Sequence, residues 1–247
     1  MPVVSVIPLE GLPELEPSDD LALLLHDAAA RMGGLEAGDV VVVAQKAVSK
    51  VEGRVVALAE IEPSERAMEL AGAEGDPRHL EVILRESAEV VRSRPPLVIT
   101  ETRHGFVCAS AGVDASNTPA EGLLVLLPLD PDASARGLRG RLVELSGADV
   151  GVIVSDSFGR AWRQGTTDVA LGVAGLAPLR DLRGTLDARG RELKTTQIAV
   201  ADEIAGAAEL VMGKAGAVPA AIVRGVDARG DGSAAELVMP RERDLFR

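Results

Sequence analysis

The strongest constraint on the fold of this chain is a short apolar run that is followed directly by hydroxyl and carboxylate side chains. Residues 149–154 read DVGVIV, a run rich in β-branched side chains, and residues 155–157 read SDS. The run is typical of a buried strand, although a short buried helix has a similar pattern. We expect the strand to end where SDS begins, with a loop containing Gly159 and Gly165 after it. Open α/β sheets commonly bind ligands at the carboxyl end of such a strand.

Further segments alternate between strand and helix patterns. A second buried-strand run, DVVVVA at residues 39–44, also leads into polar residues. The expected strands span residues 3–9, 39–44, 97–100, 106–110, 123–127, 149–154 and 220–223, and the expected helices span about residues 18–32, 64–73, 80–92, 130–145 and 193–212. Capping residues precede three of these helices, at 18–20, Ser64 and Asp130. The 247 residues allow one large domain or two that are closely joined.

Composition excludes several classes of function. The net charge is −12 and aromatic residues make up only 2% of the chain, so binding of duplex or single-stranded nucleic acid is not expected. The single cysteine, Cys108, permits no internal disulfide, which fits a reducing cytosol. No signal peptide and no apolar run of membrane-spanning length are evident, so we expect a soluble cytoplasmic protein.

The strongest candidate chemistry lies around residue 156. Asp156 and Ser157 are followed closely by Arg160 and Arg163. A carboxylate, a hydroxyl and two guanidinium groups fit a divalent metal that bridges phosphate oxygens, with the arginines on the same phosphates. The alternative is that Asp156 and Ser157 only cap a turn and that the arginines are solvated.

Other candidates are weaker when taken alone. Asp114 and Asn117 offer a second carboxylate and an amide, but they also fit an Asx turn. Lys50 is a phosphate candidate or part of a solvated helix face. The glycine-containing segment 212–219 fits a phosphate-binding nest or a helix C-cap. Neither a P-loop nor a strand-linked dinucleotide motif is present.

Four stretches together resemble one enzyme family. They are QKAVSKVEGR (45–54), ETRHGFVCASAGVDASN (101–117), SDSFGRAWRQGTTDVALGVAGLAPLRDLRG (155–184) and VADEIAGAAELVMGKAGAVPAAIVRG (200–225). In this order they strongly resemble the coenzyme F420-0:γ-glutamyl ligase family over about residues 5–226. We therefore expect one ligase unit over residues 1–247, with 227–247 as a C-terminal tail and without the nitroreductase-like domain of some actinobacterial relatives.

The resemblance implies a fold, a reaction and partners. The implied fold is an α+β fold with a mixed sheet that forms an intertwined homodimer. The implied reaction joins the amino group of L-glutamate to the lactyl carboxylate of F420-0, or of its dehydro form, through an acyl phosphate. GTP is consumed and leaves as GDP and phosphate. Mn²⁺ or Mg²⁺ is required, and K⁺ assists. Further γ-linked glutamates are compatible with this chemistry.

The resemblance also implies the site residues. Its metal ligands fall on Asp114, Asp156 and Ser157. Its GTP contacts fall on Leu12, Pro13, Glu14, Leu15, Gln45, Lys50, Asn117, Met212, Gly213, Lys214, Ala215, Gly216, Ala217, Val218 and Pro219. Lys50, Asp156, Arg160 and Arg163 are the expected catalytic residues, because phosphoryl transfer needs metal-holding carboxylates and cations that take up charge.

This sequence departs from the family pattern at three positions. Ser157 replaces a frequent Thr but keeps the hydroxyl oxygen. Gln45 stands where a Ser or His is expected, and Lys214 replaces a Gln that helps to hold metal in some relatives. A protonated lysine cannot ligate a cation, so we expect Lys214 to contact phosphate. Two alternative functions remain: another nucleotide-dependent ligase or phosphotransferase, and a non-catalytic GTP-binding regulator.

Overall fold

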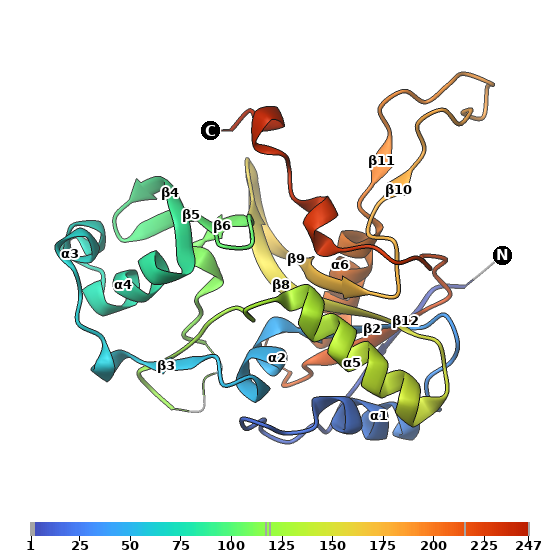
Figure 1. The fold of residues 1–247 in the computed structure, drawn as a ribbon, viewed down its shortest axis with the longest axis horizontal. Coiled ribbons are helices and arrows are strands. Elements are labelled where there is room, and N and C mark those ends of the chain that lie inside the picture. Colours follow the sequence, from blue (N-terminus) through green and yellow to red (C-terminus); the bar gives the residue numbers. More distant parts are fainter. Residues whose placement is uncertain (1–2, 117, 119, 215, 247) are drawn as a thin grey trace.

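A five-stranded mixed sheet forms the centre of the protein. The computed structural model describes residues 3–116, 118, 120–214 and 216–246. The strand order is β1-β12-β2-β8-β9 (Figure 1). The strands are β1 (Ser5–Pro8), β12 (Ala220–Arg224), β2 (Val40–Ala44), β8 (Gly151–Arg160) and β9 (Arg163–Ala174). Strands β2 and β8 are parallel and the other neighbours are antiparallel, so the expected α+β class with a mixed sheet is confirmed.

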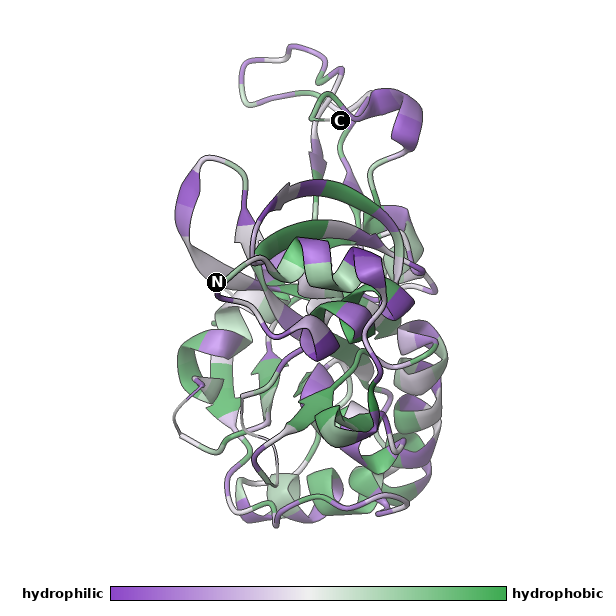
Figure 2. Cartoon of the chain, turned by 90° about the vertical axis from the view of Figure 1, so that its left-hand side faces the viewer, coloured by the Kyte–Doolittle hydropathy of each residue, from purple (hydrophilic) through white to green (hydrophobic). Residues whose placement is uncertain are grey.

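Helices cover both faces of this sheet. Helices α1 (Leu21–Arg31), α2 (Gln45–Val51) and α5 (Pro131–Ser146) contribute to the core on one face, and α6 (Val200–Met212) packs on the other. Val41 and Val43 of β2 belong to the first core, whereas Val40 and Val42 belong to the second. Burial on both faces explains why this strand has an unbroken apolar sequence. In Figure 2 the hydrophobic colouring is accordingly concentrated on strands and helices of the body.

A smaller unit is inserted between β2 and β8. It contains β3 (Val55–Ala57), η1 (Leu58–Glu60), α3 (Glu65–Ala71), α4 (Pro77–Glu86), β4 (Ser87–Arg94), β5 (Leu97–Thr102), β6 (Val107–Ala109), η2 (Ser110–Gly112) and β7 (Leu123–Val125). It has a separate hydrophobic core that includes Leu80, Ile83 and Leu124. At its boundary, Arg54 Nε donates to Leu127 O (2.9 Å), and Arg54 Nη2 pairs with Glu86 Oε2 (2.7 Å).

Most predicted elements and all three predicted caps are confirmed. The side chains of Asp20, Ser64 and Asp130 accept backbone N–H groups at the starts of α1, α3 and α5. The hairpin predicted around residues 102–105 is formed by β5 and β6. The helix predicted over 80–92 is wrong in its second half, because residues 87–94 form β4 and pair with β5. Cross-strand pairing there overrides the helical spacing of the apolar residues.

The region after residue 154 also differs from the prediction. Strand β8 continues through Arg160 and pairs with β9, so residues 155–160 are strand and not loop. The polar sequence concealed this, because the second half of the strand is not covered by a core. The helix expected over 193–212 begins only at Val200. The preceding residues belong to a projecting arm instead.

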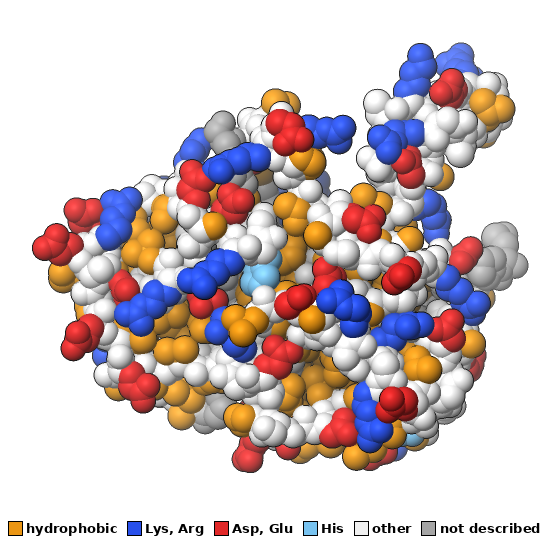
Figure 3. All heavy atoms as spheres, viewed as in Figure 1, with side chains coloured by type: hydrophobic (Ala, Val, Ile, Leu, Met, Phe, Trp, Pro, Cys, Tyr) orange, Lys and Arg blue, Asp and Glu red, His pale blue; other side chains and the backbone are white. Residues whose placement is uncertain are grey.

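The arm and the C-terminal segment lie outside the sheet. The arm is built on β10 (Arg180–Asp181) and β11 (Gln197–Ile198) and stands clear of the body with several basic side chains on it (Figure 3). The C-terminal segment contains η3 (Ala234–Leu237) and η4 (Arg241–Arg243). It packs back on the body, where Ser233 Oγ donates to Asp132 Oδ2 (2.7 Å). Among the described residues, no helix is long and apolar enough to cross a bilayer.

Candidate active site

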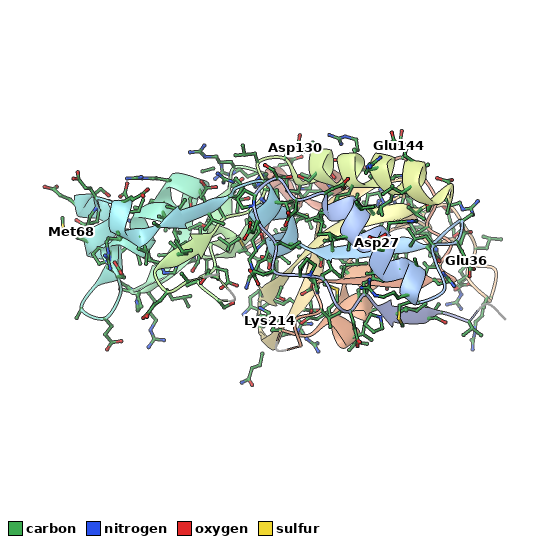
Figure 4. All side chains as sticks on the ribbon, turned by 90° about the horizontal axis from the view of Figure 1, so that it is seen from below. Asp27, Glu36, Met68, Asp130, Glu144 and Lys214 are labelled. Atoms are coloured by element: carbon green, nitrogen blue, oxygen red, sulfur yellow. The ribbon has the colours of Figure 1, made fainter. Side chains whose placement is uncertain are left out.

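A cavity lies where the parallel pairing of β2 with β8 ends, at Ala44 and Ser155. It has a volume of about 590 Å³ and is bordered by the start of α2, the β8–β9 hairpin, the end of α6 and the turn before α1. Its position at the carboxyl ends of neighbouring parallel strands matches the usual ligand position in open sheets. In Figure 4, Lys214 lies between the small unit, marked by Met68, and the opposite end, marked by Asp27 and Glu36.

The structure gathers most of the predicted site residues around this cavity. Its walls include residues 12–15, Gln45, Lys50, Asp156, Ser157, 212–214 and 217–219. Gly216 does not line it. Asn117 and Ala215 lie outside the described residues. Charged lining residues that the sequence analysis did not single out are Lys46, Asp168 and Glu209.

The β8–β9 hairpin supplies one polar wall. Ser157 and Asp168 face each other across the two strands. Ser157 Oγ donates to Asp168 Oδ1 (2.6 Å), and Ser155 Oγ donates to Asp168 Oδ2 (2.8 Å). Ser155 and Asp168 are 1% and 4% exposed. The intervening Asp156 borders the same cavity.

Asp156 is held in an unusual electrostatic environment. Burial raises the pKa of Asp156 to about 7, and the negative charges of Asp168 and Asp114 act in the same direction. The backbone N–H of Ser157 and the ammonium of Lys214 lower the pKa without compensating for burial. A carboxylate that is poorly stabilised in this way favours a bound cation.

Asp114 does not line the cavity, but it pairs with a residue that does, Lys46. Its Oδ2 atom is 2.7 Å from Lys46 Nζ, which also donates to Ser116 Oγ (2.7 Å) and Ser116 O (3.0 Å). Burial alone would raise the pKa of Asp114, but the bonds from Lys46 and Ser116 hold it below its usual value. A backbone bridge to Val125 fixes Asp114 at the edge of the small unit. Asp114 and Asp156 therefore approach the cavity from two different units of the fold.

Helix α2 provides a lysine and an oriented amide. Lys50 Nζ donates to Glu14 Oε1 (2.5 Å), which links α2 to the turn before α1. Gln45 is 1% exposed, and its Oε1 atom accepts from Ser49 Oγ (2.9 Å). Its Nε2 atom has no hydrogen-bond partner within the described part of the chain. A buried donor in a cavity wall favours a ligand with an acceptor at that point.

Helix α6 approaches the hairpin closely at Gly206. A Cβ atom there would lie 3.3 Å from Thr167 Oγ1 and 3.8 Å from Asp168 O, so the helix and the hairpin are in close contact at this point. Glu209, three residues later, lines the cavity. Burial, followed by the charge of Asp168, raises the pKa of Glu209. The close packing thus brings a further carboxylate to the cavity.

Arg160 and Arg163 are not in the cavity. They pair with each other at the tip of the β8–β9 hairpin, where both are exposed. Arg160 Nη2 donates to Gln164 O (3.4 Å). Trp162 between them is 83% exposed and contacts the ring of Phe246 from the C-terminal segment, at 4.8 Å between centroids. The extra length of β8 carries the two arginines away from Asp156.

Two cavity residues carry the kind of donor atom that Mg²⁺ and Mn²⁺ prefer. Asp156 and Ser157 offer oxygen donors, which Mg²⁺ and Mn²⁺ prefer, and Asp114 offers another if Lys46 releases it. Among the described residues, no group of three or more His, Cys, Asp or Glu side chains is already arranged around one point. Asp156 and Ser157 are thus the cavity residues that could hold such a cation.

Comparisons with known proteins agree with this arrangement. A family profile described as F420-0:gamma-glutamyl ligase matches residues 11–225. The coenzyme F420:L-glutamate ligase of Methanothermobacter thermautotrophicus is 47% identical over 250 residues, covering 99% of both chains. Those of Methanopyrus kandleri and Archaeoglobus fulgidus are 48% and 45% identical, covering 99% of this chain and 97% and 96% of their own. The chain therefore belongs to the F420-0:γ-glutamyl ligase family, a family of ligases.

Proposed function

We propose that this protein forms an amide between L-glutamate and the lactyl carboxylate of F420-0, or of its dehydro form, at the expense of GTP. The observation that carries the proposal is the cavity itself, which combines Asp156, Ser157 and Lys50 where the parallel pairing of β2 with β8 ends. Carboxylates and a lysine together suit a metal–triphosphate complex. The names of the relatives support glutamate as the second substrate.

The reaction balances in two steps. A carboxylate oxygen of the acceptor attacks the γ-phosphorus of GTP, the bond to the β,γ-bridging oxygen breaks, and GDP leaves. The resulting acyl phosphate is a good acyl donor. The glutamate amine then attacks its carbonyl carbon, phosphate leaves with the C–O electron pair, and the amine proton passes to solvent. No side chain needs to form a covalent intermediate, so positioning and electrostatics supply the catalysis.

We assign the following tasks to the residues of the cavity. Asp156, Ser157 and Asp114 hold Mn²⁺ or Mg²⁺, which neutralises charge on the transferring phosphoryl group. Lys50 and Lys214 bind phosphate oxygens as point charges. The turn at residues 12–15, Gln45 and the 212–219 segment surround the nucleotide. We also propose that a K⁺ ion assists the reaction at the nucleotide site.

We also propose that the functional form is a homodimer. The β10–β11 arm projects from the body, so a second copy of the protein could pack against it (Figure 1). The exposed hairpin tip with Arg160 and Arg163 gains a catalytic task if it reaches the cavity of the second copy. Sedimentation velocity tests the dimer directly, and a monomer at micromolar concentration would contradict it.

One assay tests the reaction. The protein is incubated with GTP, Mn²⁺, L-glutamate and F420-0, and mass spectrometry follows glutamyl additions while GDP and phosphate are quantified. We expect one GDP and one phosphate for each glutamate added. GTP binding without phosphate release would indicate a regulator. Phosphate release without a glutamylated product would indicate another ligase or phosphotransferase.

A further inference from the structure

The buried carboxylate of Asp168 has a task that the proposed reaction does not yet use. Asp168 lies on β9 and is 4% exposed, although it lines the cavity. Its two oxygen atoms each accept a hydroxyl proton, from Ser155 (2.8 Å) and from Ser157 (2.6 Å). Burial of a carboxylate is costly, so two short hydrogen bonds with cavity serines indicate a function beyond folding.

The bond from Ser157 fixes the orientation of its hydroxyl. A serine hydroxyl has one proton and two lone pairs. Because Ser157 donates its proton to Asp168, the lone pairs of its oxygen point away from Asp168 and toward the cavity that Ser157 lines. A hydroxyl oriented in this way is an acceptor, which is the form that a cation needs. Without Asp168 the proton can rotate into the cavity, where it would repel a cation.

The hairpin keeps this bond rigid. Ser157 and Asp168 are direct partners in the β8–β9 pairing, and Ser155 shares the face of Ser157 because the two residues are two apart. Asp168 therefore accepts hydrogen bonds from the hydroxyls of Ser155 and Ser157, which lie on one face of β8. Its charge also raises the pKa of Glu209, so it contributes to the negative potential of this wall. Outer residues that orient ligands in this way commonly tune metal affinity.

We propose that Asp168 is a positioning residue that holds the Ser157 hydroxyl as a cation-facing acceptor. The inference rests on the proposed function only in placing Ser157 at the cation site. It is distinct from a purely electrostatic role, in which the charge of Asp168 would attract any cation through space. It is also distinct from a structural role, in which Asp168 would only stabilise the hairpin.

Mn²⁺ binding provides a readout that does not depend on turnover. Free Mn²⁺ is titrated with the full-length protein and followed by its EPR signal, first alone and then with GDP. Asp168→Asn and Asp168→Ala are expected to raise the Kd for Mn²⁺ by about 10- to 100-fold. Asp202→Asn is the matched control: Asp202 accepts from Ala170 N of the same strand (2.9 Å) but does not line the cavity. Its Kd should stay near that of the unmodified protein.

A double-mutant cycle separates positioning from charge. If Asp168 acts through the hydroxyl, Asp168→Asn should change the Kd by less than about twofold when Ser157 is already alanine. A full additional loss in the Ser157→Ala background would overturn the proposal in favour of through-space attraction. An unchanged Kd in Asp168→Asn, with only a lower melting temperature, would overturn it in favour of a structural role.

The outcome is separable from that of the proposed reaction. Unmodified protein that binds Mn²⁺ but forms no glutamylated product would refute the reaction and leave the Asp168 cycle interpretable. Conversely, product formation together with an unchanged Mn²⁺ Kd in both Asp168 variants would refute the positioning role alone. If Asp168→Ala does not fold, Asp168→Asn retains the shape of the side chain and completes the cycle.

Discussion

The two halves of the β8–β9 hairpin are chemically different although they share one backbone. The half nearest the sheet holds Ser155, Asp156, Ser157 and Asp168 against the cavity with short hydrogen bonds. The outer half ends in exposed Arg160 and Arg163 around a Trp162 that is 83% exposed. Charges fixed in a partly buried wall act strongly, whereas exposed charges are screened by solvent. Substitutions in the two halves should therefore have very different effects.

The largest effect is expected at Asp156. Asp156→Asn removes a carboxylate that we place on the metal–triphosphate complex, and we expect kcat to fall about a thousandfold, or roughly 4 kcal/mol. Circular dichroism should show an intact fold, because Asn has nearly the same shape. Steady-state turnover at saturating Mn²⁺ is the measurement. Activity close to that of the unmodified protein would remove Asp156 from the metal site.

A smaller effect on binding is expected at Lys50, which lines the same cavity from α2. Lys50→Met should weaken GTP binding by about 10- to 100-fold, because a charge-assisted bond to phosphate is lost. Glu14→Gln is the informative companion, since Lys50 now donates to Glu14. Freeing the lysine should tighten GTP binding by up to about fivefold, as expected for an ion pair whose Glu14 side is exposed. Fluorescent-nucleotide titration measures both, and equal affinities in all three proteins would exclude Lys50 from the site.

The pKa of Asp156 predicts a pH dependence of stability in the metal-free protein. Burial raises this pKa to about 7, well above the usual value of 3.8. Between these values the folded chain holds a proton that the unfolded chain has lost, so stability falls as pH rises from about 4 to 7. The free energy of unfolding of the unmodified protein, minus that of Asp156→Asn, should fall by roughly 3 kcal/mol over this range. Urea unfolding at several pH values tests it, and a flat difference would contradict the raised pKa.

The smallest effect within one protomer is expected at the hairpin tip. Arg160→Ala and Arg163→Ala should leave the Kd for Mn²⁺ and GTP within about threefold of the unmodified value, since exposed charges contribute little. Turnover measurements then decide whether the tip acts elsewhere. A loss of kcat comparable to that of Asp156→Asn, with unchanged nucleotide affinity, would show that the tip serves the cavity of a second copy.

Sequence patterns predicted some features of the site well. The apolar runs 39–44 and 149–154 identified β2 and β8, and the polar residues after them identified the end of the sheet that carries the cavity. The arginines were misplaced relative to Asp156, because we expected a loop after residues 155–157. Strand pairing with β9 extends the backbone instead, and pairing partners are not visible in local periodicity.

The sequence by itself determined the elements with strong local signals. Asp20, Ser64 and Asp130 define helix starts through their own side chains, and β2 is marked by an apolar run that needs burial on both faces. Only the tertiary structure decided which polar groups meet. Ser157 contacts Asp168 because of the β8–β9 register, and Lys46 contacts Asp114 because two units of the fold converge. Such contacts depend on pairing between distant segments, which local spacing does not encode.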